Sequence, residues 1–264
     1  MIERPAQAGR PKPRFVLAFV LPHERALEEA RRWVRSAWIA PEALRKAKIE
    51  AIRGIYVPAY LFSATADADY SASIGEHYTE TYTSNGKTQT RTVTEWCTLY
   101  GRYTAYVSDI IVTASHGIQN HELEAIEPFD LRALHRYTPR LLSGWIAEEA
   151  SLEPETCQKL ASREAMVEVN RRIAAHLPGD RQRGLEFDAK LTDVQQELLL
   201  VPVWVLPVIY GRDKKTGKDK VVRLLVNGQT GKLFGKRPYS WTKITVLIVL
   251  LVLLIAGGSY LAFA

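Results

Sequence analysis

Apolar residues recur in three patterns along this chain, and each pattern predicts a different kind of element. Residues 23–39 and 155–176 place apolar side chains three or four positions apart, which indicates amphipathic helices. Between Thr65 and Ser73 polar and apolar residues alternate, which is typical of a strand with one buried face. Residues 244–264 contain no charged side chain, and this pattern predicts a helix of roughly 30 Å, long enough to span a bilayer.

Turn and breaker residues place the boundaries of the other elements. Pro22 and Gly54 end predicted elements, while Asn85-Gly86, Gly101 and Asn227-Gly228 indicate turns between strands. Two more helical stretches are predicted, at 42–53 and, extending the helix named above, at 145–177. The predicted strands are 15–21, 55–73, 77–83, 87–100, 102–111, 185–192, 195–209, 221–226 and 232–234.

This order of elements predicts an α+β fold, with antiparallel β-meanders packed against helices and one C-terminal transmembrane helix. In the best-defined strand we expect one face to point inward, made of Ala66, Ala68, Tyr70, Ala72 and Ile74.

The sequence VPAYLF at 57–62 resembles VPVWVL at 201–206, and each follows a helical region. One interpretation is a duplication into two α-then-β halves, 15–130 and 131–235. The alternative is that Val-Pro-x-aromatic is a common strand-edge sequence.

The apolar C-terminal run and its flank predict the domain organisation. Residues 1–14 are rich in Pro, Gly and Arg and indicate a flexible basic leader; residues 15–240 form one α+β domain; residues 241–264 form a transmembrane anchor. Basic residues close to a span favour the cytoplasmic side, so we expect a single-pass protein of the cytoplasmic membrane whose bulk faces the cytoplasm. The predicted anchor and flank residues are Lys236, Arg237, Trp241, Lys243, Ile244 and Ala264.

The formal net charge of +6 comes from the leader and from the basic residues before the anchor. Attraction to an anionic lipid bilayer is its simplest use, which makes nucleic acid an unlikely partner. A DNA-binding face built from Arg31, Arg32 and Arg35 remains an alternative.

No residues combine into a trusted catalytic, cofactor or metal site. Cys97 and Cys157 stand alone without a CxxC pair, which excludes a zinc ribbon in this chain and gives no disulfide framework. His116 and His121 lack the helical spacing of a zinc pair. We therefore predict that the protein is not an enzyme and that it binds no cofactor or metal.

Three further candidate groups have ordinary explanations. Asp67 and Asp69 fit a solvated strand face better than a cation site. The Gly86-Lys87-Thr88 triplet lacks the first glycine of a nucleotide-binding loop, because Thr81 stands there. Asp109, at the end of a predicted strand, is more typical of a turn than of a catalytic base.

Aromatic residues crowd the meander between residues 74 and 108. Some of them must fill the core, and the rest would form an exposed contact surface or an edge that accepts a partner strand. The candidate partner surface comprises Tyr78, Tyr82, Trp96, Tyr100 and Tyr103.

Several stretches resemble one bacterial family in the same order along the chain. They are ARRWVRSAWIAPEALRKA (30–47), GIYVPAYLFSATADADY (54–70), IEPFD (126–130), LLSGWIAEEA (141–150), LPGD (177–180), LLVPVWVL (199–206) and VVRLLVNGQTGKLFGKRPYSWTKI (221–244). Together they resemble bacterial membrane proteins often labelled TFIIB-type zinc-ribbon proteins or, by loose transfer, primosomal or phage replication helicases. This chain lacks the paired cysteines of the ribbon, so no metal or nucleic-acid role is transferred through it.

The resemblance implies a membrane-anchored protein whose partners include phage-shock-protein-A-like or SPFH (flotillin-like) membrane-stress proteins. The favoured hypothesis is a non-enzymatic adaptor that holds partner proteins at the cytoplasmic membrane face, in a membrane-stress response. The alternative is a membrane-tethered nucleic-acid-binding protein. Self-association of the chain is left open.

Overall fold

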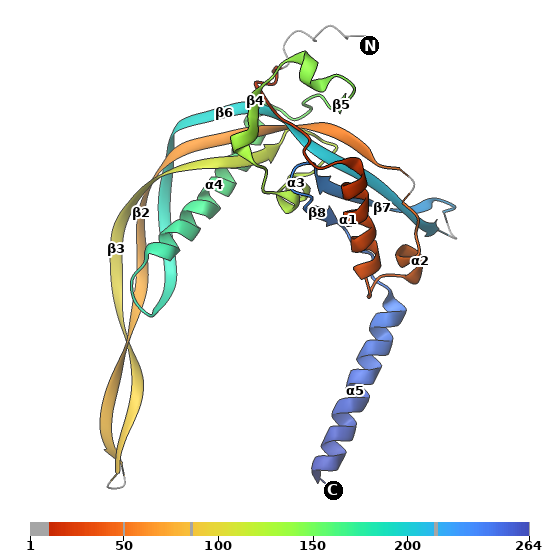
Figure 1. Cartoon of the computed structure of the whole chain (residues 1–264). Coiled ribbons are helices and arrows are strands. Elements are labelled where there is room, and N and C mark those ends of the chain that lie inside the picture. Colours follow the sequence, from red (N-terminus) through yellow and green to blue (C-terminus); the bar gives the residue numbers. More distant parts are fainter. Residues whose placement is uncertain (1–10, 50, 85–86, 214–215, 264) are drawn as a thin grey trace. The chain divides into compact units, whose positions relative to one another are not determined.

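Strands dominate the fold of this protein (Figure 1). The computed structural model describes residues 11–49, 51–84, 87–213 and 216–263, with the backbone alone at 84, 253–254 and 256–263. The strands are β1 Phe15–Leu17, β2 Arg53–Ser84, β3 Lys87–Thr113, β4 Leu134–Arg136, β5 Ile146–Ala147, β6 Arg181–Arg212, β7 Asp219–Asn227 and β8 Leu233–Gly235. The α-helices are α1 His23–Ser36, α2 Glu42–Arg45, α3 Asn120–Ile126, α4 Pro154–His176 and α5 Trp241–Phe263.

The strands form one mixed sheet, which corrects the predicted α+β fold of antiparallel meanders. The order is β3-β2-β6-β1-β4, with β7 paired to β6 and β8 to β7. β5 pairs with β2 in parallel, joining Ile55 to Ile146. The physical reason is strand length: β2 and β6 have 32 residues each and β3 has 27, so long ribbons replace the short strands that were predicted.

Two positions show why the strands run on past the predicted breaks. Gly101, predicted as a turn, pairs with Tyr70 inside the sheet, and a Cβ at Gly101 would lie 2.4 Å from the Tyr70 hydroxyl oxygen. The glycine therefore makes room for a cross-strand aromatic ring. Asp109 has a φ of 66° where the β2–β3 register shifts between Phe62 and Ala64. This β-bulge bends the ribbon without ending it.

Two predicted helices are shorter in the structure. The predicted helix 42–53 is α2, Glu42–Arg45, and Arg53 already begins β2. The predicted helix 145–177 begins at Pro154, because Ile146–Ala147 belongs to β5.

The chain divides into two compact units that differ from the predicted halves. Unit 1 comprises residues 1–14, 59–116 and 150–199, and unit 2 comprises 15–58, 117–149 and 200–264. The core of unit 1 packs α4 on β2 and β3, whereas in unit 2 the core packs α1 on β6 and β7. Each of these helices thus covers strands from the other predicted half. The duplication itself stays a prediction.

Helix α5 corrects the prediction of a transmembrane anchor. Across the part of the chain whose side chains are described, no helix is both long enough and apolar enough to cross a bilayer. The side chains described in α5 are those of 241–252 and of 255, whereas a span needs about 20 consecutive apolar residues. Ala264, the predicted end of the anchor, lies outside the described residues.

The predicted single-pass location in the cytoplasmic membrane rested on that span. This prediction, and the membrane orientation derived from the flanking cations, are corrected together with it.

Candidate protein-binding ribbon

The candidate site is the outer part of the β2–β3 ribbon in unit 1, residues 76–84 and 87–95, here called the distal ribbon. The strands pair in continuous register from Gly75 with Trp96 to Ser84 with Lys87. Asn85-Gly86, the predicted turn between them, lies outside the described residues. The rest of the ribbon carries α4 on one face, while the distal ribbon extends past that helix (Figure 1).

Pairing in register shows that the predicted aromatic surface is divided between two faces. Tyr78 opposes Val93 and Tyr103 opposes Ala68, so Tyr78, Tyr82 and Tyr103 lie on the face that α4 covers further along. Trp96 and Tyr100 oppose Gly75 and Ser71 and lie on the other face. The five aromatic residues therefore do not form one patch.

Two of these aromatic residues are already engaged within unit 1. Tyr103 packs against the core under α4, with its ring 5.7 Å from the His176 ring. The Arg183 guanidinium lies 3.8 Å from the centre of the Trp96 ring. The same ring covers Gly75, where an added Cβ would lie 3.1 Å from it.

The other three lie nearer to solvent. Tyr82 donates to Gln89 Oε1 at 3.0 Å, and Arg91 lies 5.5 Å from the centre of the Tyr82 ring. Tyr78 is 49% exposed and Tyr100 is 77% exposed. These two side chains are the most accessible aromatic groups of the predicted partner surface.

Threonine pairs occupy the other face of the distal ribbon. Thr79 opposes Thr92, Thr81 opposes Thr90 and Thr83 opposes Thr88. Facing β-branched residues favour an extended strand and pack against each other across a pair. Threonine therefore supports the ribbon where no helix covers it.

The edge of β2 that faces β6 is blocked only up to His77. The Gly75 carbonyl accepts from the Asp180 N–H at 3.0 Å, and the His77 N–H donates to Asp180 Oδ2 at 2.8 Å. Backbone N–H and C=O groups alternate in direction along an antiparallel strand, so those of Thr79, Thr81 and Thr83 point to the same side as those of Gly75 and His77. Since β6 begins only at Arg181, no described strand pairs with them.

The other edge of the ribbon belongs to β3, the first strand in the sheet order. The odd-numbered residues of β2 point their N–H and C=O groups toward β6, so they do not hydrogen-bond to β3. The even-numbered residues of β3 opposite them therefore point their N–H and C=O groups outward, away from β2. These outward residues run from Thr88 to Tyr106. No strand of the described chain pairs with this edge, so its backbone groups are available along the distal ribbon.

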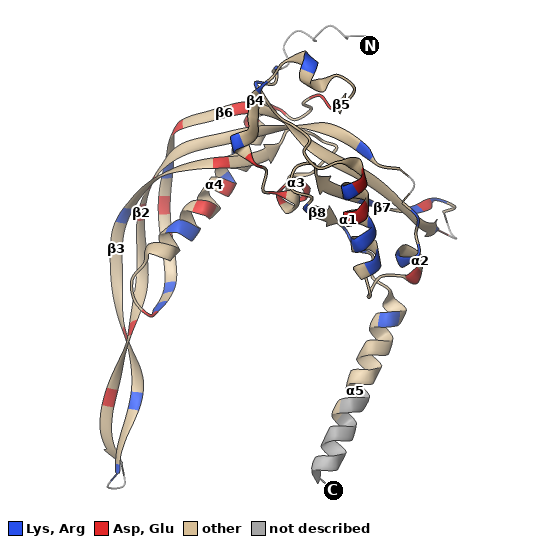
Figure 2. Ribbon diagram, viewed as in Figure 1, with Lys and Arg blue, Asp and Glu red and all other residues tan. Residues whose placement is uncertain are grey.

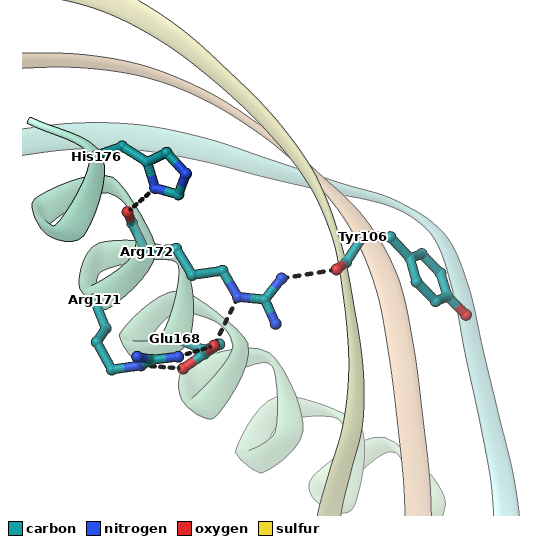
Figure 3. Close-up of polar contacts among 5 residues, drawn as sticks. All are labelled: Tyr106, Glu168, Arg171, Arg172 and His176. Carbon is teal, nitrogen blue, oxygen red and sulfur yellow. Dashed lines mark hydrogen bonds and ion pairs between the residues drawn. The ribbon is translucent and has the colours of Figure 1, made fainter.

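A charged group from α4 blocks this edge near its inner end (Figure 3). Arg172 donates to the Tyr106 carbonyl at 2.9 Å, and Glu168 holds the Arg172 side chain at 2.7 Å. Hydrogen bonds from Arg171 and then Arg172 lower the pKa of Glu168 to about 2. Edge strands are commonly protected by such charged groups, and this one protects only the part beside α4.

Charges on the distal ribbon are few and of both signs (Figure 2). The Arg91 guanidinium contacts Glu80 across the ribbon at 2.8 Å. The ribbon therefore has no strong charge preference, and backbone hydrogen bonds are the main recognition chemistry that it offers.

The predicted membrane-flank residues mainly attach the start of α5 to the end of α1 within unit 2. Lys243 donates to the carbonyls of Trp38 at 2.9 Å and Ala40 at 2.8 Å. Arg237 donates to Ser36 Oγ at 3.0 Å and lies 4.8 Å from the Trp33 ring centre. Ile244 continues the helix by donating its N–H to the Ser240 carbonyl. Lys236 is exposed, and Trp241 is 78% exposed.

The polar residues considered for metal or catalytic chemistry lie apart. Among the residues described here, no group of three His, Cys, Asp or Glu side chains is arranged to hold a metal ion. Asp67 accepts from Thr104 Oγ1 at 2.6 Å, and the His121 ring meets Phe234 edge-on at 6.0 Å. Burial raises the pKa of the Cys157 thiol to about 11, which keeps it protonated and unreactive at neutral pH.

Glu127 has a carboxyl with a perturbed pKa that no local sequence pattern indicates. Its burial, with Glu124 nearby, raises the pKa of Glu127 to about 7, and Oε1 has no hydrogen-bond partner among the described residues. Lys232 donates instead to the backbone carbonyl of Glu127 at 2.5 Å.

Several stretches that carry the family resemblance meet in unit 2, where they are structural. Asn227 Nδ2 donates to the carbonyls of Ile126 at 2.9 Å and Pro128 at 3.0 Å. Trp145 lies 5.8 Å from Trp204, ring centre to ring centre, and close against Gly54. These stretches therefore pack around the strand ends of unit 2.

Sequence reasoning did not find the groups that open or block the strand edges. Arg172 and Asp180 act on backbone atoms far away in the sequence, and no local pattern signals such a contact. The run of threonines at alternate positions was the one available signal for an uncovered ribbon.

Comparison with known proteins gives one similarity. The chain is 23% identical over 257 residues to the protein of Bacillus subtilis (strain 168) described as uncharacterized protein YdjG, covering 97% of this chain and 71% of that protein. No family model matches the chain, and no solved structure matches it. The resemblance to zinc-ribbon-labelled proteins stays an expectation, since none of these comparisons tests it.

Proposed function

We propose that this protein is a non-enzymatic adaptor that binds a partner protein by adding a partner strand to the outer edge of β3. The proposal rests on the outer edge of β3 from Thr88 to Thr104. The N–H and C=O groups that point outward there have no strand beside them in the described chain. Strand addition uses such groups for affinity and the neighbouring side chains for specificity.

The chemistry of the edge supports pairing with a different protein rather than self-association along it. Threonine is polar as well as β-branched, so the edge is suited to strand pairing without the hydrophobic character of an aggregating strand. Tyr100, which is 77% exposed, lies directly on β3 and would flank the added strand on one face. Its ring offers apolar contact area that fixes the register of that strand.

Partners to test first come from the family resemblance, which implies phage-shock-protein-A-like and SPFH proteins. They enter this proposal as candidates only. An adaptor role also agrees with the separation of the titratable residues described above, which supplies no nucleophile with a base beside it.

The test compares two substitutions at one outward-facing position. Thr92→Pro removes an N–H that the β2–β3 pairing does not use, so the ribbon persists while strand addition is blocked. Thr92→Ala keeps the N–H and removes the side chain. Each full-length variant is crosslinked to purified candidate partners and to proteins of a cell extract, and the captured proteins are compared.

A specific partner should be captured by the wild type and by Thr92→Ala and lost with Thr92→Pro. Amide exchange of Gln89 and Arg91 checks that the ribbon is intact in both variants. Equal capture by all three proteins would rule out strand addition at this edge. Loss with Thr92→Ala as well would mean that the side-chain face, and not the backbone, is recognised.

A further inference from the structure

Unit 2 contains a basic cleft that the adaptor proposal does not use. A concavity of about 620 Å³ lies between α1 and the segment that begins with α2. Its size is in the usual range of small-molecule sites, roughly 300–1,000 Å³. One wall carries Arg31 and Arg35, one helical turn apart on α1; the other carries Arg45, Lys46 and Lys48. Val34, Ala47 and Ile49 complete the lining.

Most of these cations have no counter-charge from the described residues. Lys46 pairs with Glu42 at 2.8 Å. Arg31, Arg35, Arg45 and Lys48 take part in no described ion pair. The neighbouring cations of α1 differ, since Arg25 pairs with Glu28 at 3.4 Å and Arg32 with Glu29 at 3.1 Å. The unpaired cations are therefore gathered in the cleft, while those beside it are neutralised.

Cations on two facing walls set the chemistry of the ligand. Like charges around one concavity repel each other, and a bound anion relieves that repulsion. A single phosphate reaches only a few donors, whereas a chain of phosphates can accept from both walls at once. Arginine offers paired N–H groups that match phosphate oxygens, and lysine adds point charges.

We propose that this cleft binds a small anion carrying several phosphate groups. The alternative source of the same chemistry is a phosphorylated lipid headgroup. A nucleic-acid duplex fits less well, because duplex binding uses an exposed basic stripe or a protruding helix that follows the backbone. Here the cations surround a concavity with a buried aliphatic side chain, Val34, in its lining.

The test measures binding of inorganic tripolyphosphate to the full chain by titration calorimetry. The variant Arg31→Gln/Arg45→Gln removes one cation from each wall, and Arg25→Gln/Arg32→Gln removes two paired cations outside the cleft. Both variants change the net charge equally. We expect the dissociation constant to rise at least ~10-fold in the cleft variant and to change less than ~2-fold in the control.

Two further probes distinguish the source of the phosphate. Vesicles containing a phosphatidylinositol bisphosphate, whose headgroup carries several phosphates, would identify a lipid headgroup as the ligand if the wild type and the control bind them and the cleft variant does not. A short DNA duplex that binds more tightly than tripolyphosphate, and is weakened equally by both variants, would overturn the proposal in favour of a nucleic-acid face. Absence of wild-type binding to both tripolyphosphate and vesicles would also overturn it.

The single variant Lys48→Gln provides a second check, because this exposed residue follows α2 and its substitution leaves the packing of both helices unchanged. It should weaken tripolyphosphate binding by a few-fold with an unaltered unfolding midpoint. Unchanged binding in both Lys48→Gln and a folded cleft variant would refute the site.

Discussion

The same two strands, β2 and β3, behave differently along their length within unit 1. In the inner part, Ala64, Ala66 and Ala68 are fully or almost fully buried under α4, whose Ala161 and Ala165 are buried in the same cluster. In the distal ribbon the corresponding face carries Tyr78 and other exposed residues. Small side chains therefore let a helix approach one part of a continuous ribbon, while the other part depends on cross-strand pairs alone.

Edge protection changes at the same place. Arg172 from α4 blocks the outer edge of β3 at Tyr106, and Asp180 blocks the β2 edge at Gly75 and His77. Beyond these residues both edges of the ribbon are open in the described chain. The inner part of the ribbon is thus both packed against α4 and protected at its edges. The distal ribbon has accessible edges and, in the part of the chain that the structure describes, no helix on its face.

The largest difference between the two parts should appear on truncating one aromatic side chain in each. Phe62 is fully buried, so Phe62→Ala should lower the free energy of unfolding by about 3–5 kcal/mol. Tyr78 is 49% exposed, and Tyr78→Ala should cost less than about 1 kcal/mol. Urea denaturation of both variants measures the two losses. Equal losses would show that the distal ribbon is packed as well as the inner part.

The junction between the two parts should be the next most sensitive place. Gly179 has a φ of 89°, and a Cβ there would lie 2.4 Å from Ile74 Cγ2. Gly179→Ala should cost about 1–2 kcal/mol for the backbone and a further 1–3 kcal/mol for the contact. Gly184, with a φ of 61° and open space, is the matched control and should show the backbone cost alone. Similar losses in the two variants would contradict a tight junction.

A smaller effect should follow from titrating Glu168, which holds Arg172 on the β3 edge. Its folded pKa of about 2 lies below the ordinary value of 4.5, so its stabilising contribution is complete above about pH 4.5 and is lost as the pH falls toward 2. The ion pairs face solvent, so we expect about 1 kcal/mol. Urea denaturation from pH 6 to pH 2 gives the free energy of unfolding of the wild type and of Glu168→Gln. The difference between these two free energies should shrink as the pH falls over that range. A constant difference would mean that the carboxylate charge is not used.

The smallest effect is expected on the distal ribbon itself. Glu80 and Arg91 form an exposed cross-strand pair at 2.8 Å, with side chains that are 43% and 61% exposed. A double-mutant cycle with Glu80→Gln and Arg91→Gln should give a coupling of about 0.2–1 kcal/mol that falls in high salt. A larger, salt-independent coupling would place this pair in a buried environment.

Local pattern predicted the faces of the strands better than their length. The alternation at 65–73 predicts an inward face of Ala66, Ala68, Tyr70, Ala72 and Ile74; Tyr70 is partly buried and the other four are buried. The helical spacing at 155–176 found α4 almost to the residue. Both signals depend on side chains a few positions apart, and such signals are present in the sequence alone.

The wrong predictions concern features that depend on residues far apart in the sequence or on a long segment taken as a whole. Gly101 looked like a turn because the ring of Tyr70, which lies over it, is 31 positions away. The sequence offers five aromatic residues as a candidate surface without their faces, and strand register places Tyr78 on one face and Trp96 and Tyr100 on the other. The membrane prediction came from residues 244–264, whose described side chains do not make up a spanning helix. The cleft cations Arg31 and Arg35 stand out as a basic cluster in the sequence. No local pattern indicates that Arg45, Lys46 and Lys48 lie opposite them.

In the proposed complex, a partner strand occupies the open outer edge of β3. Residue-resolved amide hydrogen exchange of the full chain tests it directly, first alone and then with the partner recovered by Thr92→Ala. We expect fast exchange at Thr88, Thr90 and Thr92 and slow exchange at Gln89 and Arg91 in the free protein, with Thr88, Thr90 and Thr92 protected in the complex. Uniform protection of all these amides in the free protein, or no added protection in the complex, would contradict it.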